Sequence, residues 1–104
     1  MEHKQVVIYA RVSSREQERE GFSIPAQLKL LKEYSLKHGF QIVKEFSDAE
    51  TAKKAGRTNY NSMLEFLRAN PDIRTVLVEK TDRLYRNFKD YVTLEDYDLE
   101  VHLV

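Results

Sequence analysis

Four short apolar runs are spaced along the chain, and each has the length and composition of a β-strand. They lie at residues 5–10, 41–46, 74–78 and 99–104. Valine, isoleucine, leucine and phenylalanine dominate them, which is typical of strands covered by other elements. The first run is the most continuous and predicts a buried strand of a parallel sheet. The second is less apolar and predicts a strand nearer the sheet edge.

The segments between these strands carry apolar residues at helical spacing. Ser23 is a suitable cap for a helix over residues 24–38, and Gly39 is a suitable stop after it. A second helix follows a cap at Thr58 or Asn59 and stops at residues 70–71. The apolar stripe of the first helix is Ile24, Leu28, Leu31 and Tyr34, and that of the second is Tyr60, Met63, Leu64 and Leu67.

A third helix is expected over residues 87–97, because Asn87 and Asp90 form a capping pair before another apolar stripe. The resulting order alternates strand and helix from end to end. Such an order predicts an α/β fold with three layers, in which helices cover both faces of a largely parallel four-stranded sheet. The length of 104 residues suits one domain, spanning residues 1–104.

Composition narrows the possible settings. The chain has 17 basic and 17 acidic residues and no cysteine. A net charge of zero argues against strong non-specific DNA binding by this chain alone, and the absence of cysteine excludes disulfides and thiolate metal sites. No signal region or membrane-spanning run is present, so a cytoplasmic location is expected. The last residues read as a strand without a polar tail, which suggests a piece of a longer protein.

Polar residues with related chemistry follow the first three predicted strands. Because parallel strands end at one edge of the sheet, these residues are expected to converge there. Arginine presents a planar fork of donors that matches phosphate oxygens, and several arginines around one serine suit phosphoryl transfer. The converging residues are Arg11 and Ser13 after the first strand, Asp48 and Arg57 after the second, and Asp82, Arg83 and Arg86 after the third.

Two separated motifs resemble the N-terminal catalytic domain of serine recombinases, the resolvase and invertase family. The first is Tyr-Ala-Arg-Val-Ser at residues 9–13, followed by Gln17 and then by Gly-x-Ser-x-x-x-Gln ending at Gln27. The second runs over residues 78–86 and contains Asp-Arg-Leu-x-Arg. The spacing between Ser13 and Gln27 is closest to that of large serine integrases and transposases.

The resemblance implies a role for each matching residue. Ser13 would attack a DNA phosphodiester to give a 5′-phosphoserine link, with Arg11, Arg83 and Arg86 around the phosphate. Asp82 would orient an arginine or protonate the departing 3′-oxygen. The family needs neither a metal nor ATP, so no cofactor is expected. Further site residues implied by the match are Arg57 as a catalytic arginine and Tyr9, Gln17, Gln27, Asp48 and Lys80 as DNA-binding or supporting residues.

The resemblance also implies partners. Family members act on two DNA sites as dimers that assemble into tetramers, and they do not involve a membrane. They continue into a long assembly helix and a DNA-binding region, and both are absent from these 104 residues. We therefore expect this chain to bind DNA weakly and to recombine nothing by itself.

Simpler interpretations accompany several of these residues. Tyr9 lies inside a strand and is expected to be a packing residue rather than a nucleophile. Unaided by the resemblance, Gln17 and Gln27 read as surface residues and Arg57 as a solvated charge. Asp48 has an alternative as the partner of a nearby lysine, either Lys53 or Lys54, and Ser13 has one as a turn cap.

Two other functions remain open from the residues alone. The first is a metal-dependent nuclease that uses Asp48, Glu79 and Asp82, because two-metal chemistry holds its ions with carboxylates. Several arginines at the same edge would oppose cation binding there. The second is a non-catalytic α/β module that holds a phosphorylated ligand on its arginines.

Overall fold

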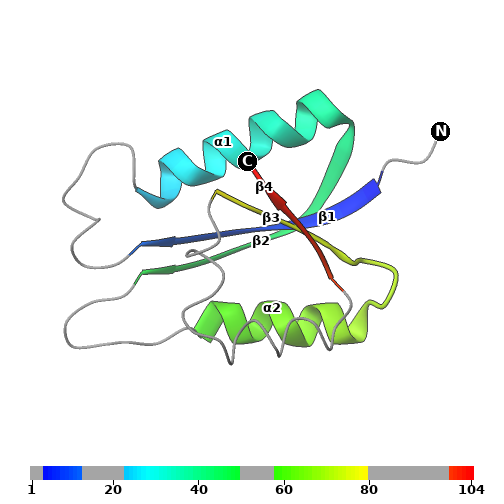
Figure 1. Cartoon of the computed structure of the whole chain (residues 1–104). Helices are drawn as coiled ribbons and strands as arrows, with labels where there is room; N and C mark the ends of the chain where they lie inside the picture. Colours follow the sequence, from blue (N-terminus) through cyan, green and yellow to red (C-terminus); the bar gives the residue numbers. More distant parts are fainter. Residues whose placement is uncertain (1–3, 13–22, 50–57, 80–98) are drawn as a thin grey trace.

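A computed structural model describes residues 4–12, 23–49, 58–79 and 99–104 of the chain. The described strands form one parallel sheet in the order β2-β1-β3-β4, with α1 on one face and α2 on the other (Figure 1). The predicted three-layer α/β fold is therefore confirmed. The predicted helix at 87–97 lies outside the described residues. The elements are β1 (Lys4–Val12), α1 (Ile24–His38), β2 (Phe40–Ala49), α2 (Thr58–Ala69), β3 (Thr75–Val78) and β4 (Glu100–Leu103).

Two strands are longer than their apolar runs predicted, and this changes the setting of two site residues. β1 continues through Arg11 to Val12, and β2 continues through Asp48 to Ala49. The prediction that Arg11 and Asp48 follow their strands is wrong. The two strands pair with each other up to Val12 and Ala49, so β-pairing carries the polar residues into the sheet.

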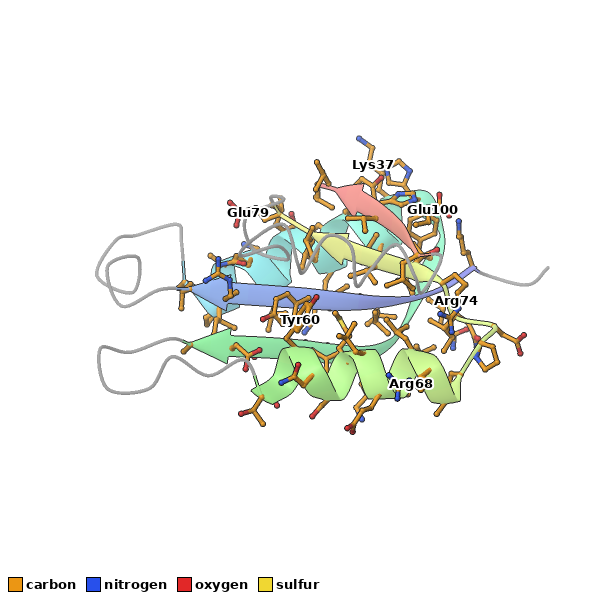
Figure 2. The ribbon with its side chains drawn as sticks, turned by 60° about the horizontal axis from the view of Figure 1, so that its bottom comes forward. Lys37, Tyr60, Arg68, Arg74, Glu79 and Glu100 are labelled. Carbon is orange, nitrogen blue, oxygen red and sulfur yellow. The ribbon has the colours of Figure 1, made fainter. Side chains whose placement is uncertain are left out.

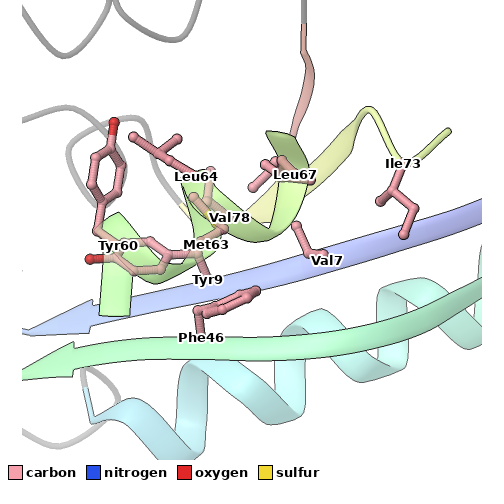
Figure 3. Close-up of a cluster of buried hydrophobic side chains, with 10 residues drawn as sticks. Val7, Tyr9, Phe46, Tyr60, Met63, Leu64, Leu67, Ile73 and Val78 are labelled. Carbon is pink, nitrogen blue, oxygen red and sulfur yellow. The ribbon is translucent and has the colours of Figure 1, made fainter. Parts of the chain in front are cut away.

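The sheet has a core on each face because successive side chains of β1, an interior strand, point to opposite faces. Val7 and Tyr9 face α2, whereas Val6 and Ile8 face α1. The core under α2 is the larger one, and Figure 3 shows its side chains between the helix and the sheet. The predicted stripe of α2 is confirmed as buried core, with Tyr60, Met63, Leu64 and Leu67 all buried.

Both ends of α1 agree with the sequence prediction. The Ser23 hydroxyl accepts a hydrogen bond from the Ala26 N–H at 3.2 Å, and Pro25 lies in the first turn. Gly39 adopts a left-handed conformation with φ of 70°, which glycine tolerates without the steric penalty of a side chain. The helix therefore begins and ends at residues whose chemistry specifies those ends.

The ends of α2 are secured by side chains from outside the helix. Thr58 and Asn59 lie inside α2, so the prediction that one of them precedes the helix as its cap is wrong. The carboxylate of Asp48, on β2, accepts N–H groups of the first turn instead. At the other end the Arg74 guanidinium donates to the carbonyls of Leu67 and Asn70. An acid at the N-terminus and a base at the C-terminus both complement the helix dipole.

Candidate active site

Four of the predicted site residues lie in the part of the chain that the structure describes. Tyr9 and Arg11 lie on β1, Gln27 on α1 and Asp48 on β2. All four are buried, with exposed fractions of 9% or less. The remaining predicted residues lie outside the described ranges; they are Ser13, Gln17, Arg57, Lys80, Asp82, Arg83 and Arg86.

Arg11 and Asp48 are neighbours across the two strands. They occupy paired positions in the parallel register of β1 and β2, close to the carboxyl ends of both. Side-chain alternation places Arg11 on the same face as Tyr9, and Asp48 on the same face as Phe46. Both Tyr9 and Phe46 belong to the core beneath α2. Arg11 and Asp48 therefore share the α2 face of the sheet, next to the first turn of that helix.

The Asp48 carboxylate joins three elements. Its Oδ1 accepts the N–H of Asn59 at 3.0 Å, and its Oδ2 accepts the N–H of Tyr60 at 2.8 Å. Oδ2 also accepts the hydroxyl of Tyr9 at 2.8 Å. A buried carboxylate needs such donors to offset the loss of water. Asp48 thus anchors the start of α2, and Arg57 is the residue immediately before that helix in the chain.

Tyr9 is a packing residue, as the sequence predicted. Its side chain is fully buried, and its ring meets that of Tyr60 edge-to-face with centroids 5.8 Å apart. Figure 3 shows the two tyrosines together at one end of the α2 core. The hydroxyl of Tyr9 donates to Asp48, a contact that spans 39 residues of sequence. Tyr9 therefore links β1 to the Asp48 carboxylate on β2.

Gln27 is buried, which corrects its reading as a surface residue. Its exposed fraction is 1%, and its amide bonds to the main chain of Arg11. The buried face of α1 is the row Gln27, Leu31 and Ser35, with a spacing of four residues. Because Gln27 and Ser35 are polar, the apolar spacing did not include them. The predicted buried face of α1 is therefore rotated slightly about the helix axis from the observed one. The spacing of Gln27 four residues before Leu31 was the available signal.

The three carboxylates proposed for a metal site, those of Asp48, Glu79 and Asp82, do not share one setting in the structure. Asp48 already accepts three hydrogen bonds in the interior. Glu79 is half-buried at the end of β3 (Figure 2), and Asp82 lies outside the described residues. Among the residues that the structure describes, no three or more His, Cys, Asp or Glu side chains are grouped so that they could hold a metal ion.

No helix in the described part of the chain has both the length and the apolar character needed to cross a membrane.

The parallel sheet, its covering helices and an arginine near the carboxyl end of the central strand define a resolvase-like α/β domain. The family model described as the resolvase N-terminal domain matches residues 6–103. The chain therefore belongs to the resolvase N-terminal domain family. The predicted relationship to serine recombinases is confirmed.

Solved structures of related domains agree with this assignment. The N-terminal catalytic domain of TP901-1 integrase is 31% identical, with a TM-score of 0.79 over 96% of this chain and 77% of that one. A resolvase family site-specific recombinase from Streptococcus pneumoniae is 33% identical, with a TM-score of 0.78 over 96% of this chain and 71% of that one. The catalytic domain of ISC1926 TnpA, an IS607-like serine recombinase, is 25% identical, with a TM-score of 0.76 over 96% and 67%.

A phage protein is also related in sequence. The protein named uncharacterized immunity region protein 3, from Bacillus phage phi105, is 40% identical over 65 residues, which cover 62% of this chain and 79% of that protein. Together with the integrase and the IS607-like recombinase, it associates the chain with DNA recombination and mobile elements.

Proposed function

We propose that this chain is the catalytic domain of a site-specific DNA recombinase in which Ser13 is the nucleophile. The observation that carries the proposal is the burial of Arg11 near the carboxyl end of the central strand, two residues before Ser13 in a chain that matches the resolvase family. An arginine held at that edge can bind a phosphate that enters beyond the strand ends.

The proposed reaction exchanges one phosphate ester for another. The Ser13 hydroxyl gives its proton to water as its oxygen forms a bond to phosphorus, and the bond from phosphorus to the 3′-oxygen breaks. The departing 3′-oxygen takes up a proton, for which Asp82 is the candidate donor. The phosphoserine ester conserves the energy of the broken bond, so religation needs no metal or ATP. Arg11, Arg57, Arg83 and Arg86 would stabilise the added charge, and loss of one such donor costs on the order of 10²–10³ in rate.

Partners follow from the same proposal. The substrate is duplex DNA carrying two recombination sites, and the active assembly is a homo-oligomer of two to four protomers. The domain would receive its DNA through the neighbouring regions that recombinases carry. The names of the matched proteins, an integrase and site-specific recombinases, support this interpretation.

The test is capture of a covalent adduct. The chain, at high concentration because its net charge is zero, is incubated with a pool of duplex DNA of random sequence and then denatured. We expect a DNA adduct that survives detergent, maps to Ser13 by mass spectrometry and is lost in Ser13→Ala. The matched control is Ser62→Ala, an exposed serine on α2.

Three outcomes would overturn the proposal. An undiminished adduct in Ser13→Ala would exclude that serine as the nucleophile. Cleavage that stops with a chelator and returns with magnesium would favour the metal-dependent nuclease. Reversible binding of DNA or inorganic phosphate with no adduct from the unmodified chain would favour the non-catalytic phosphate-binding module.

A further inference from the structure

The main chain of Arg11 is held by a side chain from the helix on the opposite face of the sheet. The N–H of Arg11 donates to Oε1 of Gln27 at 3.2 Å. Nε2 of Gln27 donates to the carbonyl of Arg11 at 3.0 Å. One amide therefore binds both polar groups of a single strand residue, across 16 residues of sequence.

This contact lies beyond the last pair of β1 and β3 residues in the described part of the chain. Among the residues that the structure describes, β1 pairs with β3 as far as Ile8 and Leu77, whereas β1 itself continues to Val12. A buried main-chain group without a partner is costly, so the end of β1 needs hydrogen bonds on that side. A glutamine amide offers an acceptor and a donor in one plane, as a peptide group does. Gln27 thus gives the Arg11 main chain the donor and the acceptor that a neighbouring strand would otherwise offer.

We propose that Gln27 is a positioning residue for the cleavage reaction, which acts through the main chain of Arg11 and does not contact DNA. The inference rests on the proposed function, because it requires Arg11 to bind the phosphate. With an exposed fraction of 1% and with both amide atoms engaged by Arg11, Gln27 is directed into the protein rather than towards a ligand. We call these two hydrogen bonds between the Gln27 amide and the Arg11 main chain the clamp. The clamp holds β1 two residues before Ser13 in the sequence.

The first measurement needs no DNA and examines the clamp alone. In Gln27→Met, a side chain of similar length has no polar group for Arg11. We expect amide hydrogen exchange at Arg11 to accelerate by about 10-fold or more relative to the unmodified chain, because its N–H loses its acceptor. The matched control is Ser35→Ala, which removes a buried hydroxyl from the same helix, bonded only to its own turn among the contacts described. It is expected to leave Arg11 exchange unchanged.

The second measurement separates positioning from DNA binding. In the adduct assay, Gln27→Met is expected to lower the rate at saturating DNA by about 10- to 100-fold, because misplacement of a reacting group by about 1 Å has an effect of that size. The DNA concentration that gives half the maximal rate is expected to stay unchanged. Thermal unfolding identifies a variant that fails to fold; Gln27→Asn, one methylene shorter, then replaces it.

The third measurement is a rescue that a purely structural role in packing would not produce. In Gln27→Glu, the ionised carboxylate repels the Arg11 carbonyl, whereas the neutral acid donates to it as the amide does. The adduct rate of this variant divided by that of the unmodified chain should therefore rise as the pH falls. In Gln27→Met the same ratio should not change with pH.

The outcomes distinguish this inference from the function on which it rests. Accelerated Arg11 exchange without any adduct from the unmodified chain would retain the clamp and reject its catalytic purpose. Unchanged Arg11 exchange in Gln27→Met would reject the clamp. An unchanged maximal rate with a higher DNA requirement would make Gln27 a DNA-binding residue and overturn the proposal.

Discussion

At position 48, a single carboxylate connects two strands with the first turn of a helix. Asp48 lies on β2, accepts the hydroxyl of Tyr9 from β1 and accepts two N–H groups of α2. Main-chain N–H groups at a helix start have no partner within the helix, and a nearby negative charge also suits the helix dipole. Asp48 therefore links the first turn of α2 to both β1 and β2.

We predict that Asp48→Asn destabilises the domain by about 1–3 kcal/mol. The amide keeps one acceptor atom but directs its NH₂ group towards donors that previously met an oxygen. Urea unfolding followed by circular dichroism measures the change. Asp72→Asn is the control, because Asp72 is exposed in the turn after α2. Equal midpoints for Asp48→Asn and the unmodified chain would show that these hydrogen bonds contribute nothing net.

At the level of elements, the two helices contribute unequal amounts of apolar surface to the core. α2 buries four large residues against β1 and β2, including Leu67 with no exposed surface. α1 presents Leu36 to solvent with an exposed fraction of 83%. The stability of α2 thus depends on tertiary contacts, while part of the apolar composition of α1 is irrelevant to the core.

Two leucine substitutions on the two helices test this difference. Leu67→Ala should lower the free energy of unfolding by about 2–5 kcal/mol, because it removes buried methyl groups and leaves a cavity. Leu36→Ala should change it by no more than about 0.5 kcal/mol. Urea or thermal unfolding of both variants gives the comparison. Similar losses in the two variants would contradict the assignment of the core to the α2 side chains.

The edge strand β4 is tied to the start of β1 and to α1 by a polar cluster. Glu100 accepts from the Lys4 ammonium at 2.5 Å and contacts Nε2 of His102 at 2.7 Å. The hydroxyl of Tyr34 lies 3.3 Å from Nδ1 of the same histidine. The hydrogen bond from Lys4, followed by that from His102, lowers the pKa of Glu100 to about 2. Figure 2 shows Glu100 near the amino-terminal end of the sheet, away from the proposed site.

The lowered pKa predicts a defined dependence of stability on pH. Because the pKa is lower in the folded state than the ordinary value of 4.5, the stabilisation is complete above about pH 4.5 and disappears as the pH falls towards 2. Glu100 is solvent-exposed, so the effect is small. The difference in urea midpoint between the unmodified chain and Glu100→Gln should narrow over that range. NMR titration should also show the pKa of Glu100 moving up towards 4.5 in Lys4→Met; an unchanged value would exclude Lys4 as the cause.

At the scale of the whole molecule, the balance of charge sets the affinity that we expect of this chain for DNA of any sequence. Seventeen basic residues are matched by 17 acidic ones, so no excess charge draws the chain to a polyanion. Affinity for any DNA sequence grows with the number of phosphates that a protein neutralises. A local cluster of arginines can bind one phosphate without giving the domain a high affinity for duplex DNA.

We accordingly predict that the chain alone binds duplex DNA of random sequence with a dissociation constant weaker than about 10⁻⁶ M at physiological salt. Fluorescence anisotropy of a labelled duplex at two salt concentrations measures both the affinity and its salt dependence. Submicromolar binding with a steep salt dependence would contradict the expectation and indicate a basic DNA-binding surface within these residues.

The sequence predicted the elements better than the contacts between them. Residues with strong local signals lie where expected, such as Ser23 and Gly39 at the ends of α1. The misplaced features were polar residues at strand ends and inside a helix. The apolar runs predict that Arg11 and Asp48 lie just after the ends of their strands, yet pairing between β1 and β2 extends past both. The sequence predicts an exposed Gln27, because the Arg11 main chain that it binds belongs to β1 and not to its own helix.

By itself, the sequence determined the parallel α/β order, the edge position of β2, the buried stripe of α2 and the membership of the recombinase family. These follow from apolar spacing, capping residues and short motifs, all of which act between residues close in the chain. Only the tertiary structure decided that Asp48 would secure the first turn of α2 and that Gln27 would hold the main chain of Arg11. The physical reason is that a buried polar group must find partners in the interior, and which partners are within reach is set by how strands and helices are brought together.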